Sequence, residues 1–265
     1  MEPSEITDRL AAVSDIIARI LSPEHKEQEF KADILGRSQN VTTAKITLSG
    51  QQAVARIFTL DVAGQAAFGR ERRALELLAG GQIPKLLFVA EAERLILTSF
   101  IDGVSLANSL NPDNLIQMSE FLGQWFGRLS NHAPAEEAGG TWAEYIAKYP
   151  AGFAQDVLAQ QAEILQKTPL KRLMLAHNDN ALGNFILGKD KRLYAIDFED
   201  CQMKPEGWDL IMATRAIFRR FPDDLPMIAS SVLRGYRLGA KNCGLSDDFE
   251  AIISALVLAN LLDRA

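Results

Sequence analysis

The chain has 265 residues, of which 48% are hydrophobic, and it carries a formal net charge of −6. This length allows one large domain or two smaller ones with a substantial core, and the negative charge argues against binding of nucleic acid through bulk electrostatics. Two cysteines, Cys201 and Cys243, and three scattered histidines provide neither a disulfide framework nor the spacing of a zinc site.

The N-terminus lacks the basic flank and compact apolar run of a secretory signal. No segment reaches the roughly 18 consecutive apolar residues that a membrane span requires. We therefore expect a cytoplasmic protein that uses no membrane and no nucleic acid as a partner.

The first hundred residues predict a β-rich lobe. Residues 5–21 place apolar side chains at helical spacing, which predicts an amphipathic helix that covers this lobe. Short β-favouring runs separated by polar turns fill residues 31–60 and predict an antiparallel meander. Residues 66–79 return to a helical period, and strand-like runs follow at 85–90 and 94–100. This order predicts an α+β lobe with one helix packed on an antiparallel sheet.

The remaining residues predict a mainly helical lobe. Helical periodicity or composition marks 105–110, 113–131, 142–149, 154–166, 208–218, 225–238 and 246–262. Residues 171–200 are the exception, because a loop rich in His, Asn, Asp and Gly there precedes a short apolar strand.

Two short segments carry the strongest chemical signal. Residues 176–187 contain His-Asn-Asp-Asn-Ala-Leu-Gly-Asn, and residues 194–200 read Tyr-Ala-Ile-Asp-Phe-Glu-Asp. Phosphoryl transfer from ATP needs a carboxylate that orients the attacking hydroxyl, and oxygen ligands for the magnesium ion on the phosphates. Asp179, Asn184 and Asp197 are residues of these kinds. The alternative is a polar turn in which Asn and Asp tolerate an irregular backbone.

The intervals in these segments resemble the catalytic loop and metal-binding segment of the protein-kinase-like superfamily. Together with Trp-Asp-Leu at 208–210, they are most similar to choline and ethanolamine kinases and aminoglycoside phosphotransferases. The resemblance implies a protein-kinase-like two-lobed fold. It implies a nucleotide-binding lobe at residues 1–98 and a helical catalytic and substrate-binding lobe at residues 99–265.

The resemblance also implies roles for the residues that match these families. The aspartate that matches Asp179 acts as a base or orients the acceptor hydroxyl, and Asn184 and Asp197 would hold Mg²⁺. His177 would brace the catalytic loop. Asp209 resembles the buried acid that ties this loop to the helix beneath it.

Arg56 and Glu71 are candidates for nucleotide binding in the first lobe. Arg56 lies on a largely apolar strand face and needs an anionic partner, for which Glu71 on the next helix is the nearest candidate. The two resemble the phosphate-binding lysine and helix glutamate of kinase-like folds, with arginine as a departure from the protein-kinase pattern. The alternatives are a snorkelling edge-strand arginine and a solvated glutamate.

The phosphate-covering loop and the segment between the lobes give weaker signals. Residues 35–40 contain one glycine where protein kinases have three, and Ser38 is the candidate phosphate contact, although a hairpin turn explains the same residues. Ser99, Phe100 and Ile101 resemble the segment whose main chain binds adenine. A strand end followed by a turn is the alternative there.

Acidic and aromatic residues near the metal segment suggest the acceptor. Glu199, Asp200 and Trp208 are the candidate acceptor contacts, and the same regions also contain Glu206, Asp223, Asp224, Trp142, Tyr145, Tyr149 and Tyr236. Such groups favour a cationic acceptor through ion pairs and cation–π contacts. The alternative for each residue is that the aromatic rings fill the helical core and the acids lie at helix ends.

The sequence therefore predicts an enzyme that uses ATP and Mg²⁺ to transfer the γ-phosphate to a hydroxyl of a small metabolite. A choline- or ethanolamine-like amino alcohol or an aminoglycoside is the leading acceptor, with sugars, homoserine and thiamine left open. The alternative is a nucleotide-binding pseudokinase without turnover, which the glycine-poor loop and Arg56 would favour.

Overall fold

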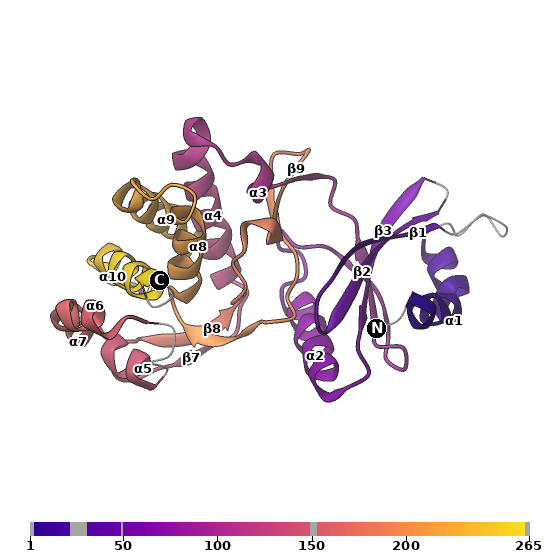
Figure 1. Cartoon of the computed structure of the whole chain (residues 1–265), viewed down its shortest axis with the longest axis horizontal. Helices are drawn as coiled ribbons and strands as arrows, with labels where there is room; N and C mark the ends of the chain where they lie inside the picture. The colour runs from indigo at the N-terminus through magenta and orange to yellow at the C-terminus, as the bar shows by residue number, and fades with distance from the viewer. Residues whose placement is uncertain (1–2, 22–30, 49, 149–152, 263–265) are drawn as a thin grey trace. The chain divides into compact units, whose positions relative to one another are not determined.

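The structure is a computed structural model that describes residues 3–21, 31–48, 50–148 and 153–262 (Figure 1). The chain forms two compact units. The first contains residues 1–102 and 196–200, and the second contains residues 103–195 and 201–265. The mixed content, with an antiparallel sheet near the N-terminus and helices after it, confirms the predicted α+β class.

The first unit is built on a five-stranded antiparallel sheet with strand order β1-β2-β3-β5-β4. Its strands are β1 (Lys31–Arg37), β2 (Val41–Leu48), β3 (Gln51–Phe58), β4 (Leu86–Ala90) and β5 (Leu95–Ser99), and its helices are α1 (Pro3–Leu21) and α2 (Val62–Leu77). β3 is therefore the central strand.

Each of the two helices packs against the sheet of this unit (Figure 1). The apolar stripe of α1, which includes Leu10 and Ile17, joins Ala55 and Ile57 of β3 in a buried cluster. The alternate residues of β3 point to the other face, where the centroid of the Phe58 ring lies 5.7 Å from that of Phe68 on α2. Because side chains alternate along β3, the sheet face that packs against α1 is apolar. The face that packs against α2 also carries the charged Arg56.

The start of α2 explains why it begins four residues before the predicted boundary at residue 66. Asp61 caps the helix by accepting a hydrogen bond from the Gly64 main-chain N–H at 2.7 Å, and one from the Thr59 hydroxyl at 2.9 Å. These two bonds lower the pKa of Asp61. A Cβ atom on Gly64 would lie 2.2 Å from the Thr59 carbonyl oxygen, so glycine allows the chain to approach itself closely here.

The second unit is mainly helical and contains two small three-stranded sheets, β10-β9-β6 and β11-β8-β7. Its strands are β6 (Gly103–Ser105), β7 (Ala135–Glu137), β8 (Arg172–Ala176), β9 (Phe185–Gly188), β10 (Leu193–Ala195) and β11 (Gln202–Pro205). Its helices are α3 (Leu106–Ser109), η1 (Pro112–Asn114), α4 (Leu115–Ser130), α5 (Trp142–Lys148), α6 (Gln155–Gln160), α7 (Ala162–Lys167), η2 (Leu182–Asn184), α8 (Trp208–Phe218), α9 (Leu225–Gly239) and α10 (Phe249–Leu262).

Helices α4 and α9 are in direct main-chain contact. A Cβ atom on Gly123 of α4 would lie 2.0 Å from the Val232 carbonyl oxygen, and one on Gly235 of α9 would lie 2.1 Å from the Glu120 carbonyl oxygen. Gly127 and Gly239 show the same close approach. The absence of side chains at these four positions therefore sets the separation of the two helices.

The first unit differs in two ways from the expected lobe of residues 1–98. The first stretch of that unit extends to Asp102, and residues 196–200 also belong to it. No pattern in the sequence indicates that this short segment leaves the unit of its neighbours along the chain.

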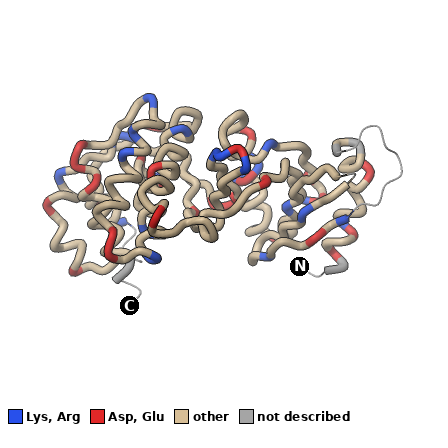
Figure 2. Tube along the Cα trace, turned by 90° about the horizontal axis from the view of Figure 1, so that it is seen from above, with Lys and Arg blue, Asp and Glu red and all other residues tan. Residues whose placement is uncertain are grey.

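Basic and acidic residues are interspersed along the trace of each unit (Figure 2). Across the described residues, every helix is too short or too polar to cross a membrane.

Candidate functional site

Asp209 organises the loop that follows β8. It lies in the first turn of α8 and is 8% exposed. Its carboxylate accepts hydrogen bonds from the main-chain N–H groups of His177 at 2.8 Å and Asn178 at 3.0 Å, and from the Asn180 side-chain amide at 2.9 Å. One carboxylate therefore ties three loop residues to α8.

The two residues that precede Asp179 in the chain, His177 and Asn178, are held in place by contacts with other side chains. The His177 ring is 1% exposed and packs against the rings of Trp125 and Phe185, with centroids 6.2 and 5.6 Å away. Asn178 has a φ of 67°, a conformation that asparagine tolerates better than most residues. Its side-chain carbonyl accepts a hydrogen bond from Trp208 Nε1 at 3.1 Å. The loop is therefore held in one conformation by groups on both sides of its backbone.

Asp179 and Asn184 are in direct contact within the second unit. Asp179 Oδ2 accepts a hydrogen bond from Asn184 Nδ2 at 2.8 Å, and Asp179 Oδ1 accepts one from the Ala181 main-chain N–H at 3.3 Å. Both side chains are partly exposed. Among the described residues, none donates to Asn184 Oδ1, so this oxygen keeps its capacity to act as a ligand for a cation.

Arg56 is the centre of a buried ionic cluster in the first unit. It is 6% exposed on the central strand β3, which excludes the edge-strand alternative. Its Nε lies 3.1 Å from Glu71 Oε1, as expected from the sequence, and its Nη2 donates to Asp197 Oδ1 at 2.6 Å. Nη2 also lies 3.8 Å from Glu199 Oε1. One guanidinium therefore serves three carboxylates.

Burial and neighbouring charges shift the pKa values of Glu71 and Glu199. Burial raises the pKa of Glu71 to about 7 although Arg56 opposes the shift, and Asp197 and Glu199 add to it. Burial and Asp197 likewise raise the pKa of Glu199. For Arg56, burial alone would lower the pKa, but the three acids outweigh it and raise the pKa. The cluster thus has an excess of negative charge that a further cation would relieve.

Arg70 is a residue of this region that the sequence did not single out. Its Nε donates to the Glu199 main-chain oxygen, and its Nη2 lies 3.8 Å from Asp200 Oδ1. Together with Arg56 it holds residues 196–200 against α2 and β3, including Asp197 at a φ of 69°. The sequence shows only that an arginine precedes Glu71, which is too common a pattern to be a signal.

Ser38 lies in the turn between β1 and β2. Its hydroxyl oxygen accepts hydrogen bonds from the main-chain N–H groups of Asn40 at 3.3 Å and Val41 at 3.2 Å. Its own N–H donates to the Val41 oxygen at 2.8 Å. The side chain therefore closes a hairpin turn in this structure.

The end of β5 contains the three residues expected to contact adenine. The Ser99 N–H donates to the Lys85 oxygen at 2.9 Å, so this donor is already used within the sheet. The Ser99 hydroxyl accepts from the Lys85 N–H at 2.9 Å. The main chain of Phe100 and Ile101, beyond the strand, remains the candidate contact.

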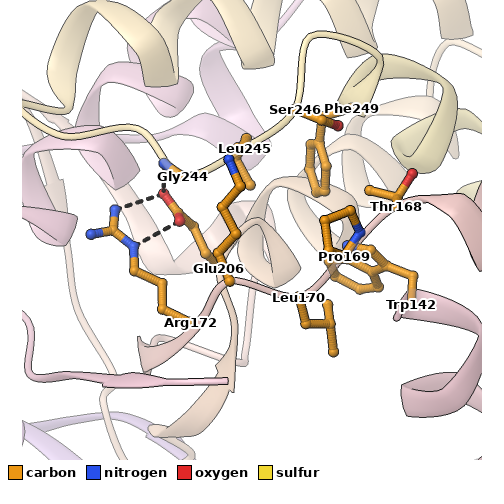
Figure 3. Close-up of a pocket in the computed structure, with 11 residues that line it drawn as sticks. Trp142, Thr168, Pro169, Leu170, Arg172, Glu206, Gly244, Leu245, Ser246 and Phe249 are labelled. Carbon is orange, nitrogen blue, oxygen red and sulfur yellow. Dashed lines mark hydrogen bonds and ion pairs between the residues drawn. The ribbon is translucent and has the colours of Figure 1, made fainter. Parts of the chain in front are cut away.

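Several residues of the expected acceptor cluster instead support the fold of the second unit. Glu206 accepts hydrogen bonds from Arg172 at 2.7 and 2.8 Å and from the Gly244 N–H at 3.1 Å (Figure 3). It also accepts one from the Tyr236 hydroxyl at 2.7 Å. Trp142 and Tyr236 are buried. The Glu206 carboxylate and the Tyr236 hydroxyl are therefore engaged with each other inside this unit.

The other acceptor candidates have contacts of their own. Trp208 is partly buried next to Asn178, and Lys204 Nζ lies 5.4 Å from the centroid of its ring. Tyr145 meets the same ring at 5.9 Å. Glu199 and Asp200 belong to the first unit, where Arg56 and Arg70 contact them. Asp223 and Asp224 immediately precede α9, and Tyr149 lies outside the described residues.

The Glu206 network makes stability depend on pH. Burial would raise the pKa of Glu206, but the hydrogen bonds from Arg172, Tyr236 and Gly244 outweigh it and hold the pKa below its ordinary value. The folded pKa is therefore below the unfolded one, so Glu206 contributes stability above about pH 4.5 that is lost as pH falls through the folded pKa. We expect Glu206→Gln to lower the free energy of unfolding by about 2–3 kcal/mol at pH 7.

Urea denaturation of both proteins at a series of pH values between 7 and 3 checks this expectation. The difference in the free energy of unfolding between wild type and Glu206→Gln should narrow as the pH falls. Glu137→Gln, at an exposed position, should leave this free energy nearly unchanged at every pH. A gap that is constant over this range would contradict the expected linkage.

The oxygen donors of the two clusters suit magnesium. Within the described ranges, no group of three or more His, Cys, Asp or Glu side chains is arranged to hold a metal ion on its own. Mg²⁺ commonly uses one or two protein oxygens together with substrate phosphates and water. In the second unit, Asn184 Oδ1 is a donor of that kind. In the first unit, so is the second carboxylate oxygen of the partly exposed Asp197.

Comparison with known proteins identifies the family. The model of the phosphotransferase enzyme family matches residues 34–240, which is most of the chain. The chain therefore belongs to the phosphotransferase enzyme family, as the resemblance in the sequence indicated. No curated protein sequence matches it.

Solved structures with similar folds include three phosphotransferases. The choline kinase from Cryptosporidium parvum Iowa II is 13% identical with a TM-score of 0.62, covering 96% of this chain and 87% of that chain. The macrolide 2'-phosphotransferase MphH from Brachybacterium faecium is 13% identical with a TM-score of 0.58, covering 95% and 94%. A thermostable mutant of aminoglycoside phosphotransferase APH(4)-Ia, in ternary complex with AMP-PNP and hygromycin B, is 14% identical with a TM-score of 0.51, covering 96% and 99%. At these identities the likeness concerns the fold, and it confirms the predicted kinase-like fold.

Proposed function

We propose that this phosphotransferase-family chain is a small-molecule kinase that uses ATP and Mg²⁺ to phosphorylate a hydroxyl group. The observation that carries the proposal is the contact between Asp179 and Asn184, at 2.8 Å, on a loop that Asp209 holds in place. A carboxylate beside an amide oxygen that can bind a cation is what positioning of an acceptor hydroxyl next to a metal-bound phosphate requires.

In this mechanism Asp179 orients the acceptor hydroxyl and accepts its proton. The acceptor oxygen forms a bond to the γ-phosphorus, and the bond from phosphorus to the bridging oxygen breaks, with its electron pair leaving on ADP. Asn184 and Asp197 would hold the magnesium ion, which when bound neutralises charge on the phosphates. Arg56 orients Asp197 through their 2.6 Å hydrogen bond.

Nucleotide binding is assigned to the first unit and acceptor binding to the second. The kinase-like fold supports ATP as the donor, and the ternary complex of the APH(4)-Ia mutant contains the ATP analogue AMP-PNP. We assign adenine contacts to the main chain of Phe100 and Ile101, and phosphate contacts to the turn that contains Ser38. Two free cysteines and the use of ATP favour action in the cytoplasm.

The acceptor is proposed to be a small hydroxylated metabolite. An amino alcohol or an aminoglycoside is the leading class, because structural neighbours include a choline kinase and an aminoglycoside phosphotransferase complex with hygromycin B. In this chain Trp208 is the aromatic candidate that contacts the catalytic loop, through its hydrogen bond to Asn178 next to Asp179.

A nucleotide-binding pseudokinase is the second candidate. The observation that favours it is the Arg56–Asp197 hydrogen bond, which occupies one oxygen of the proposed metal ligand. In that function the cluster would bind nucleotide without productive placement of the γ-phosphate.

An acceptor panel separates the two candidates. Purified protein is incubated with ATP and either Mg²⁺ or excess EDTA, and ADP release is measured with choline, ethanolamine, homoserine, thiamine, simple sugars and aminoglycosides. We expect Mg²⁺-dependent ADP release with one acceptor class. ATP binding without ADP release for any acceptor would favour the pseudokinase, and absence of ATP binding would refute both.

A further inference from the structure

Lys45 lies on the same face of the sheet as Arg56. On β2 it pairs with Val54, which is two residues from Arg56 on β3. Its neighbours Ala44 and Ile46 point to the opposite face and pack in the cluster with α1. Because side chains alternate along a strand, Lys45 and Arg56 project from the face that α1 does not cover.

An aromatic ring is the contact that the structure gives to the Lys45 ammonium. Its Nζ lies 4.4 Å from the centroid of the Phe100 ring. The acid directly opposite in the strand pairing is Asp33, which forms an ion pair with Lys31 at 3.2 Å. Among the described residues, no carboxylate forms an ion pair with Lys45. A cation–π contact at a partly exposed site is weaker than charge-assisted hydrogen bonds to phosphate.

Arg56 has little positive charge to offer a nucleotide. Glu71, Asp197 and Glu199 surround its guanidinium. A polyphosphate approaching this face would therefore meet excess negative charge at Arg56 and an unneutralised cation at Lys45. Diagonal neighbours on adjacent strands lie about 7–8 Å apart, within the combined reach of a lysine side chain and a phosphate chain.

We propose that Lys45 binds phosphate oxygens of the nucleotide and supplies the positive charge that the acids around Arg56 have neutralised. The ligand class is a nucleoside di- or triphosphate, and the proposal rests on the proposed function of the first unit as the nucleotide-binding one. On binding, the ammonium exchanges the Phe100 ring for phosphate oxygens, which leaves the ring beside the base.

Calorimetric titration of wild type, Lys45→Met and Lys45→Arg with ATP, ADP and adenosine in Mg²⁺ tests the proposal. We expect Lys45→Met to raise the Kd for ATP and ADP roughly tenfold, which one charge-assisted interaction supplies, and to leave the Kd for adenosine unchanged. Lys45→Arg should restore most of the ATP affinity. The matched control Arg73→Met removes one positive charge from an exposed site on α2 and should leave all three Kd values unchanged.

The outcomes separate this proposal from the proposed function. Equal ATP affinity in wild type and Lys45→Met would overturn the role of Lys45 while leaving the nucleotide-binding function intact. Equal losses of affinity for ATP and for adenosine would also overturn it, because adenosine has no phosphate and its binding cannot depend on a phosphate contact. If wild type binds no ATP, both fall. Thermal melting checks folding, and Lys45→Gln replaces Lys45→Met if the latter is unfolded.

Discussion

Replacing Asp179 with asparagine is expected to lower kcat for phosphate transfer by roughly 10²–10⁴-fold, the range typical for loss of a positioned general base. The amide has nearly the shape of the carboxylate, and its oxygen can still accept the hydrogen bond from Asn184 that the structure shows at 2.8 Å. The substituted side chain cannot accept the proton of the acceptor. The geometry of the loop is therefore kept while its proposed chemistry is removed.

ADP release at saturating ATP and acceptor measures this effect. The Kd for ATP and the free energy of unfolding should stay close to those of wild type, since the bonds of Asp209 to the loop are untouched. Asp156→Asn, on the exposed side of α6, is the matched control. A kcat for Asp179→Asn within a few-fold of wild type would show that Asp179 neither accepts the proton nor orients the hydroxyl.

The largest effect on stability is expected for Arg56→Met. This change leaves Glu71, Asp197 and Glu199 without their shared cation, and removing one partner from a buried ionic cluster typically costs about 3–5 kcal/mol. Methionine fills a similar volume, so the loss arises mainly from charge. Urea denaturation of wild type and variant gives the difference in the free energy of unfolding.

The loss should depend on pH in a defined direction. The pKa of folded Glu71 is raised to about 7, chiefly by burial, and Arg56 holds it down. Without Arg56 the folded pKa rises further above the unfolded value, so the folded state binds the extra proton and stability falls as pH rises above about 4.5. The deficit of Arg56→Met should therefore be smaller at pH 5 than at pH 8. Adding Glu71→Gln to Arg56→Met should recover part of it at pH 8, and a deficit that is equal at both pH values would contradict this account.

The residues that could be predicted from the sequence are those whose relationships are local. Asp179 and Asn184 were singled out together because they are five positions apart on one loop, and the structure adds that their side chains meet at 2.8 Å. The pairing of Arg56 with Glu71 was also expected, since an arginine on an apolar strand face needs a nearby acid on the next helix.

Relationships between distant segments could not be predicted. Nothing near residue 70 in the sequence indicates that Arg70 contacts the Glu199 main chain, because that contact joins positions 129 residues apart. The segment 196–200 joins the first unit through such contacts alone. Likewise, the sequence placed Glu206 among the acidic residues of an acceptor site, because its partners Arg172 on β8 and Tyr236 on α9 are each about 30 residues or more away in the chain.

The short strands of the second unit escaped prediction for a different reason. β6 and β7 each contain three residues, too few for an alternating pattern to stand out, and they form because partner strands accept their main chains. The predicted helix boundaries were inaccurate where a side-chain cap sets the first residue of the helix. Asp61 accepts a hydrogen bond from the Gly64 main chain, and α2 therefore starts at Val62 and not at residue 66.

The glycine contacts between α4 and α9 leave no side-chain layer that could adjust to a change in either helix. Tyr236 lies next to Gly235 on α9, and its hydroxyl meets Glu206 at 2.7 Å. The position of the Tyr236 main chain, from which the hydroxyl reaches Glu206, is therefore fixed by main-chain contacts with α4. A methyl group added at Gly235 would clash with the Glu120 carbonyl oxygen of α4 and push the two helices apart. That movement would draw the Tyr236 phenol away from Glu206, whose carboxylate also accepts the hydrogen bond from Gly244.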